Sequence, residues 1–319
     1  MLAQQLKISP PNPFEKVEIV VHSWPTSRWL REQLATVNGV SAQVEFLFPR
    51  SYLRKTVQIL LKTNDDSDPW KAKKLVWPIL TLLPEFVQTK DGLYLQEWLK
   101  KQKPIPNQLN KCEWQLARSI ADAFDDYILY RPDYVSEWLE ASEEDIKSLI
   151  TTFPSNIRWQ PQLLRLLGKQ INSQPFNQQA KQIIEQIKQK KLTREILPGK
   201  LTFFGLSKLA PIQLQLLKAI SAIADVQIFL ITPCPDLWKF LQKSKDLITT
   251  DWSNPNVISW SIESPSIESN LGKMGAEFQL QLEGSGPDQF AESINKDLFL
   301  SPTNIAKKHS KEPSLLEQV

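Results

Sequence analysis

Hydrophobic residues near the N-terminus follow the short runs that are typical of buried strands. VEIVV (Val17–Val21) is a short β-branched run, which predicts a buried strand, and VEFLF (Val44–Phe48) is a second strand candidate. A helical pattern from about Ser51 to Lys62 follows the second run. Strand and helix therefore alternate from the start of the chain.

The segment between the two strand candidates has the period of an amphipathic helix. Leu30, Leu34 and Val37 fall on one face after the turn SWPT, so we expect that face to be buried. Pro25 suits the first helical turn, and Gly39 suits the residue that ends the helix.

Beyond NDDSDP (Asn64–Pro69) the period becomes helical and strand signals almost vanish. The clearest helix is Lys111–Tyr130, whose predicted buried stripe consists of Leu116, Ile120, Ala123, Phe124, Tyr127 and Ile128. Further predicted helices are Ala72–Leu83, Asp133–Leu139, Pro161–Ile171 and Gln179–Lys190.

Strand character returns in the last third of the chain. LTFFGL (Leu201–Leu206) and VQIFLIT (Val226–Thr232) flank a predicted helix at Pro211–Ala222. Nearly continuous apolar strands joined by a helix imply parallel pairing with helices on both faces. The sequence thus predicts an α/β domain interrupted by an all-helical insertion.

We expect four parts along the chain. They are the first part of the α/β lobe at 1–63, the inserted helical domain at 64–195, the second part of the lobe at 196–285, and a disordered tail at 286–319.

Composition narrows the class of protein. The 319 residues are 41% hydrophobic and 23% charged, as in an ordinary globular protein. The net charge of +3 permits nucleic-acid contact along one face but does not argue for it. Cys112 and Cys234 are too few for a disulfide framework, and the N-terminus MLAQQLKISPPNPF lacks the apolar core of a signal peptide. Lys218 and Asp225 interrupt the longest apolar run. We therefore expect a cytoplasmic protein without membrane contact.

The sequence lacks the residues that ATP hydrolysis, zinc binding and histidine-dependent catalysis require. Gly168–Lys169, Gly199–Lys200 and Gly272–Lys273 are not followed by Ser or Thr and lack the preceding glycine of a phosphate-binding loop. His22 and His309 are the only histidines, too few for a zinc site or a histidine-dependent nucleophile.

The stretch FDDYILYRPDYVSEW concentrates carboxylates on and after the helix Lys111–Tyr130. Asp122, Asp125 and Asp126 are expected opposite or beside its apolar stripe, and Asp133 follows Pro132 at the start of the next helix. Spacing alone favours a solvated helix face and an N-terminal cap over metal catalysis.

Aromatic and basic residues after the two N-terminal strands are candidates for nucleic-acid contact. Trp24 lies in the turn beside Arg28, where it can stack on a base or simply fill space, whereas Trp29 is more typical of a core. Arg50 and Arg54 are one helical turn apart, which suits two phosphates or a solvated face.

Four stretches resemble the gamma subunit of exodeoxyribonuclease V, the RecC family. Trp114–Trp138 contains the long pattern FDxYxxYRPxxxxxW, and Leu201–Cys234 has the family's strand, Leu-Ser, helix and strand ending in Pro-Cys. Val17–Ala35 is similar to the family's first strand and helix with their Trp-Leu pair, and 254–260 with 270–278 is similar to a later segment. The resemblance runs in order from about residue 15 to 280.

The resemblance implies a superfamily 1 helicase-like lobe, related to RecA, with a large helical insertion and no working Walker motifs. It implies no cofactor in this chain, with ATP and Mg²⁺ on RecB-like helicase–nuclease and RecD-like helicase partners. It also implies that the carboxylate helix borders a channel for the 3′-ended single strand.

Family positions that contact DNA carry over residue by residue. They fall on His22, Trp24, Arg28, Phe48, Arg54, Asp122, Asp125, Asp126 and Arg131. Around the first three, the sequence departs from the family's Gln-Ser-Thr-Gly pattern. The family also continues through further domains that have no counterpart here, so we expect this sequence to be a fragment.

Two function hypotheses follow. The first is a non-catalytic DNA-binding and scaffold module of a RecBCD-type complex in double-strand-break repair by homologous recombination. The second is a truncated remnant that acts as a protein–protein interaction module without DNA contact. An independent ATPase is a third and weaker hypothesis, because the phosphate-binding residues are missing.

Overall fold

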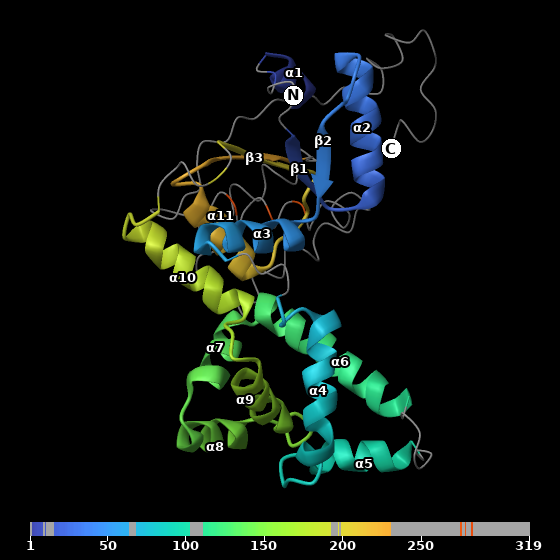
Figure 1. The fold of residues 1–319 in the computed structure, drawn as a ribbon, viewed down its shortest axis with the longest axis vertical. Coiled ribbons are helices and arrows are strands. Elements are labelled where there is room, and N and C mark those ends of the chain that lie inside the picture. Colours follow the sequence, from blue (N-terminus) through green and yellow to red (C-terminus); the bar gives the residue numbers. More distant parts are fainter. Residues whose placement is uncertain are drawn as a thin grey trace, which may run out of the picture.

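A parallel sheet of four strands, with the helices that pack on it, forms one part of the molecule, which we call the sheet lobe (Figure 1). The structure is a computed structural model that describes residues 2–8, 10, 16–63, 68–102, 111–192, 197, 199–230, 275, 278 and 282. The strands, in the spatial order β2–β1–β3–β4, are β1 (Val17–Val21), β2 (Val44–Leu47), β3 (Lys200–Phe204) and β4 (Asp225–Phe229). The predicted α/β class with parallel strands is confirmed. Ile231 and Thr232, the predicted end of the last strand, lie outside the described residues.

Alternate side chains of the strands pack against helices on the two faces of the sheet. Ile19 and Val21 join one apolar cluster with α1 and α2, whereas Val20 joins the larger cluster that includes α3 and α11. Because successive strand residues point to opposite faces, a nearly continuous apolar strand such as β1 is buried on both sides. The helices at the sheet are α1 (Leu2–Ile8), α2 (Trp24–Asn38), α3 (Pro49–Leu61) and α11 (Pro211–Ile220).

A group of helices separates β2 from β3 along the chain and lies below the sheet lobe in Figure 1. They are α4 (Ala72–Phe86), α5 (Leu93–Lys101), α6 (Lys111–Tyr130), α7 (Pro132–Glu140), α8 (Glu143–Thr152), α9 (Trp159–Ile171) and α10 (Phe176–Lys188). The central contact of the group joins α4 to α6, and α10 packs on α3 and α11 as well as on α6 and α7. Helix α10 therefore links this group to the sheet lobe.

The predicted helices are confirmed, and α6 has the predicted bounds. Helix α4 continues beyond its predicted end at Leu83, through Pro84 to Phe86, because Pro84 removes one N–H but the Val87 N–H still bonds to the Leu83 carbonyl oxygen. Helices α1, α5 and α8 were not predicted. For α8 a signal was present, since Ser142 precedes three acidic residues and its Oγ accepts from the Asp145 N–H at 3.2 Å.

Two residues of α2 were wrongly placed in the core. Leu30 and Leu34 are buried as predicted, and Gly39 ends the helix with φ of 83°. Trp29 and Val37 are half exposed instead. The 15-residue helix is about 22 Å long, whereas the five residues of β1 span roughly 16 Å. The last turn of α2, with Val37, thus extends past the sheet.

The expectation that all three aspartates of α6 lie opposite or beside its apolar stripe is wrong for Asp125. Asp122 and Asp126 are exposed, but Asp125 is only 6% exposed. Ile128 and Phe124 are buried on the same side. The cause is tertiary, because this side of α6 meets the basic face of α3 and the start of α4.

Asp125 and Arg54 form the centre of a buried ionic contact between the sheet lobe and the helical group. Arg54 Nη2 lies 2.8 Å from Asp125 Oδ1, and Arg54 also forms an ion pair with Asp68. The second carboxylate oxygen of Asp125 accepts the Ala72 N–H at the start of α4, at 3.2 Å. The contact therefore joins α3, α4 and α6 at one point.

The guanidinium of Arg54 is paired with two carboxylates, although its buried Nε atom makes no hydrogen bond to a described residue. Burial lowers the pKa of Arg54 and the attraction of Asp125 offsets part of this effect, which leaves the pKa at about 10, so the group is charged at neutral pH. Its carbon Cζ also lies 5.5 Å from the ring centre of Phe176 on α10. Charge, hydrogen bonds and ring contact together hold four helices.

Replacing Asp125 should destabilise the fold strongly. Asp125→Ala leaves the buried Arg54 charge without its main hydrogen-bonded partner on α6, so we expect the free energy of unfolding to fall by about 3 kcal/mol. Urea denaturation followed by circular dichroism measures this. Asp122→Ala is the matched control on the same helix: its i,i+4 pair with Arg118 is exposed, and we expect a change below about 0.5 kcal/mol. Equal effects of the two changes would contradict the assigned role.

Candidate nucleic-acid interface

The candidate residues gather where β1 and β2 end and the helices α2 and α3 begin. In an open parallel sheet, the carboxyl ends of the strands are the usual place for ligands. After β1 comes a short turn of two residues, His22 and Ser23. Ser23 Oγ accepts the Thr26 N–H at 3.4 Å and lies 2.9 Å from Thr26 Oγ1, so it caps α2.

Trp24 and Phe48 form an aromatic pair at these two strand ends. Trp24 is the first residue of α2, and Phe48 directly precedes α3. Their ring centres are 5.1 Å apart at an interplanar angle of 81°, which is an edge-to-face contact. Trp24 is 69% exposed, so a broad indole face remains open to solvent beside Phe48.

Arg50 connects this aromatic pair to the carboxylates of α6. It is two residues after Phe48, and its Nη2 lies 2.7 Å from Asp125 Oδ1 and donates to the Asp125 carbonyl oxygen at 3.1 Å. Its Nη1 is 3.7 Å from Asp126 Oδ1. Asp126 and Arg50 are both partly exposed. We call the group Trp24, Phe48, Arg50 and Asp126 the strand-end wall.

The two arginines of α3 differ in burial: Arg54 is buried and Arg50 is partly exposed. Arg54 is a family DNA-contact position but is 4% exposed, whereas Arg50, which was a candidate from its spacing alone and not a carried-over family position, reaches the surface. A signal existed in the sequence: Arg54 lies between Leu53 and Val57, both fully buried, and therefore inside the apolar arc of the helix. Arg54 and Asp125 support the wall from beneath and are not part of its surface.

The other predicted residues flank the wall. His22 is exposed at the end of β1, and Arg28 lies on the outer side of α2, 3.3 Å from Glu32. Asp122 is one turn before Asp126 on α6 and pairs with Arg118 at 2.9 Å. Arg131 follows α6, is exposed, and has no side-chain partner among the residues that the structure describes. The structure thus brings Trp24 and Phe48 together and links Asp126 to Arg50, two residues after Phe48. It shows no contact of His22, Arg28, Asp122 or Arg131 with this group among the described residues.

The described part of the chain contains no group of three His, Cys, Asp or Glu side chains that could hold a metal ion. Within that same part, no helix is long and apolar enough to cross a membrane. The chemistry of the wall is instead aromatic stacking combined with charges of both signs.

The exposed Trp24 should be dispensable for folding. Trp24→Ala removes a solvent-facing ring and one ring contact, so we expect it to lower the free energy of unfolding by about 1 kcal/mol or less. Trp138→Ala is the contrasting variant, since Trp138 is buried against Tyr127, Tyr134 and Phe153, and we expect a loss of 3 kcal/mol or more, roughly. Thermal denaturation of both variants measures the difference. A large loss for Trp24→Ala would assign this residue to the core.

Comparison with known proteins gives a consistent result. The family described as "RecC, N-terminal domain" matches residues 1–319. The "RecBCD enzyme subunit RecC" of Haemophilus influenzae is 27% identical over 256 residues, which is 75% of this chain and 22% of that protein. The Escherichia coli protein of the same name is 25% identical over 232 residues, 71% of this chain and 20% of its own length. The Mycobacterium tuberculosis protein is 25% identical over 249 residues, with 72% and 21% covered.

This chain spans about a fifth of the length of these relatives. Because the family match extends over the whole sequence, the chain belongs to the RecC N-terminal domain family.

Proposed function

We propose that the chain is a non-catalytic DNA-binding and scaffold module of a RecBCD-type helicase–nuclease in double-strand-break repair, and that its strand-end wall borders the path of a single-stranded, 3′-ended DNA. The observation that carries the proposal is the exposed Trp24–Phe48 pair beside Arg50. Membership of the RecC family supports it, since the relatives are named as subunits of the RecBCD enzyme.

The composition of the wall suits a strand that moves. A base can stack on the open face of Trp24 without regard to its identity. Arg50 is 3.7 Å from Asp126, a loose and partly exposed pair that a passing phosphate can replace at small cost. Asp122 and Asp126 can accept hydrogen bonds from base amino groups but repel phosphates. Such mixed charges hold a strand weakly, as sliding requires.

Catalysis then belongs to the partner subunits. A phosphate cradle after β1 would need free backbone N–H groups at the start of α2. In this chain Ser23 occupies the Thr26 N–H, and Pro25 has no N–H to offer. These features support our proposal that ATP and Mg²⁺ act on RecB-like and RecD-like partners and that this chain positions DNA.

Changes in the wall should weaken DNA binding without unfolding the protein. For a fluorescent single-stranded oligonucleotide, we expect the double change Trp24→Ala and Phe48→Ala to lower affinity by roughly tenfold, since stacking on a base is worth about 1–3 kcal/mol. Fluorescence anisotropy measures the affinity. Trp77→Ala, an exposed tryptophan on α4 away from the wall, is the aromatic control and should leave the affinity unchanged.

The salt dependence of binding tests the basic residues separately. Arg131→Ala and Arg28→Ala should each reduce the slope of log affinity against log salt by about 0.7, the value for one phosphate contact on a single strand. Lys147→Ala on α8 is the charge control. If a folded protein binds the oligonucleotide with an unchanged slope in both arginine variants, these residues do not contact the strand.

A second candidate function has its own supporting observation. Large side chains are exposed on the outer sides of α4, α5 and α6, notably Trp77 (65%), Tyr94 (49%), Trp98 (36%) and Trp114 (43%). Exposed aromatic residues of this density favour a protein–protein contact surface. This surface is separate from the wall and is compatible with a scaffold role.

Replacing these aromatic residues should reduce association. Trp77→Ser combined with Trp114→Ser should lower the binding of a hydrophobic fluorescent dye and suppress any concentration-dependent self-association in analytical ultracentrifugation, because less apolar surface is exposed. The Trp24→Ala variant serves as a comparison. Equal dye binding by the double variant and the parent chain would rule out this surface.

A further inference from the structure

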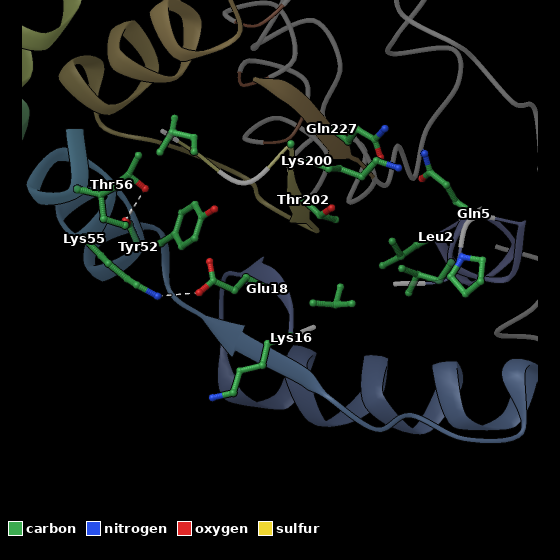
Figure 2. A pocket seen from close by; sticks show the side chains of 16 residues that line it. Leu2, Gln5, Lys16, Glu18, Tyr52, Lys55, Thr56, Lys200, Thr202 and Gln227 are labelled. Atoms are coloured by element: carbon green, nitrogen blue, oxygen red, sulfur yellow. Dashed lines mark hydrogen bonds and ion pairs between the residues drawn. The ribbon is translucent and has the colours of Figure 1, made fainter. Parts of the chain in front are cut away.

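A hollow of about 600 Å³ opens at the edge of the sheet opposite the strand-end wall (Figure 2). The ladder between β1 and β3 begins at Ile19 and Thr202, whereas the ladder between β1 and β2 begins two residues earlier, at Val17 and Val44. The N-terminal ends of β1 and β3 therefore diverge. The hollow lies in this gap, with α3 on one side and α1 on the other.

Three polar atoms that line the hollow have no hydrogen bond to a described residue. Tyr52 on α3 is 4% exposed and Thr202 on β3 is 5% exposed, yet neither hydroxyl has a hydrogen bond to any described residue. Buried polar groups are normally satisfied, yet the Gln227 Oε1 atom on β4 is buried without a partner within the described ranges. The two hydroxyls line the same hollow, so a ligand there can bond to all three groups.

The lining also contains apolar walls and a positive rim. Leu2 and Leu6 of α1 and Ile59 of α3 line the hollow, and Lys200 at the start of β3 is exposed without an ion pair among the described residues. Lys55 is held by Glu18 at 2.7 Å. Lys200 is thus the cation most free to bind an anionic group.

Tyr52 is a neutral donor in this setting. Burial, and secondly the nearby charge of Glu18, raise the pKa of its phenol. The ring is fixed by an edge-to-face contact with Phe203, with ring centres 5.9 Å apart. The hydroxyl is therefore held in a constant position toward the hollow, as Figure 2 shows.

We propose that this hollow binds a nucleoside monophosphate. Its volume is in the range of small-molecule sites, which combine apolar walls with a few placed polar groups. A flat base fits between the apolar walls, the hydroxyl of Thr202 and the amide of Gln227 match the mixed donors and acceptors of a base edge, and Lys200 neutralises the phosphate. The site is independent of the strand-end wall, because the five residues of β1, which span roughly 16 Å, separate the two.

Isothermal titration calorimetry with the four 2′-deoxynucleoside 5′-monophosphates tests the proposal on the purified chain. We expect saturable binding with one site, weakened about tenfold by Lys200→Ala and by the nearly isosteric Thr202→Val. Lys147→Ala, which removes an exposed lysine on α8, is the matched control and should bind like the parent chain. Thermal denaturation confirms that each variant is folded.

Three outcomes would overturn the proposal. One is the absence of binding by folded protein at millimolar nucleotide. Another is binding of inorganic phosphate as tight as that of the nucleotides, which would leave no role for the base. The third is displacement of a labelled oligonucleotide by the nucleotides, which would place them on the strand-end wall. Failure of the oligonucleotide to bind at all would concern the wall alone and leave the calorimetric result intact.

Discussion

The buried contact of Arg54 with Asp125 is the constraint on which the arrangement of the molecule depends. It joins α3, the helix that follows the second strand of the sheet, to α6, the longest helix of the group inserted before β3. Removing two charges from water is costly unless each is paired and hydrogen-bonded. Here Asp68, the Ala72 N–H and the ring of Phe176 complete the surroundings. Because the ion pair requires the Asp125 carboxylate to point at Arg54, it fixes which side of α6 faces the sheet lobe.

The orientation of α6 decides which of its carboxylates remain on the surface. With Asp125 turned inward, Asp122 and Asp126 point outward, and Arg50 bridges between the buried and the exposed aspartate. The aromatic pair at the ends of β1 and β2 then lies on the same side as Arg50. The exposed wall combines open aromatic rings with the loose Arg50–Asp126 pair. The buried Arg54–Asp125 ion pair lies beneath it and supports it. The division between support and contact surface thus follows from burial and not from residue type.

The two edges of the sheet have different chemistry for a geometric reason. At the carboxyl ends, the connections into α2 and α3 are short, so Trp24 and Phe48 are brought close together. At the amino ends, β1 and β3 are not consecutive along the chain, since α2, β2, α3 and the whole helical group come between them, and the two strands diverge before their ladder begins. Side chains of Tyr52, Thr202 and Gln227 consequently surround a space that the strands do not close. A single sheet therefore offers an aromatic surface at one edge and a polar hollow at the other.

Local pattern alone determined the strands, the long helix Lys111–Tyr130 and the parallel α/β class, because apolar period and turn residues are properties of neighbouring positions. The turn position of Trp24 left open a surface role for it, whereas Phe48 became a candidate only through the family resemblance. Leu53 and Val57 beside Arg54 were a signal in the sequence that Arg54 is buried. Tertiary structure decided the fate of Asp125, since the stripe of α6 does not reveal which charged residue meets an arginine from 71 positions earlier. It likewise decided that Arg50 reaches the surface and that Val37 extends past the sheet. Those outcomes depend on helix lengths and on contacts between distant segments, which no local pattern encodes.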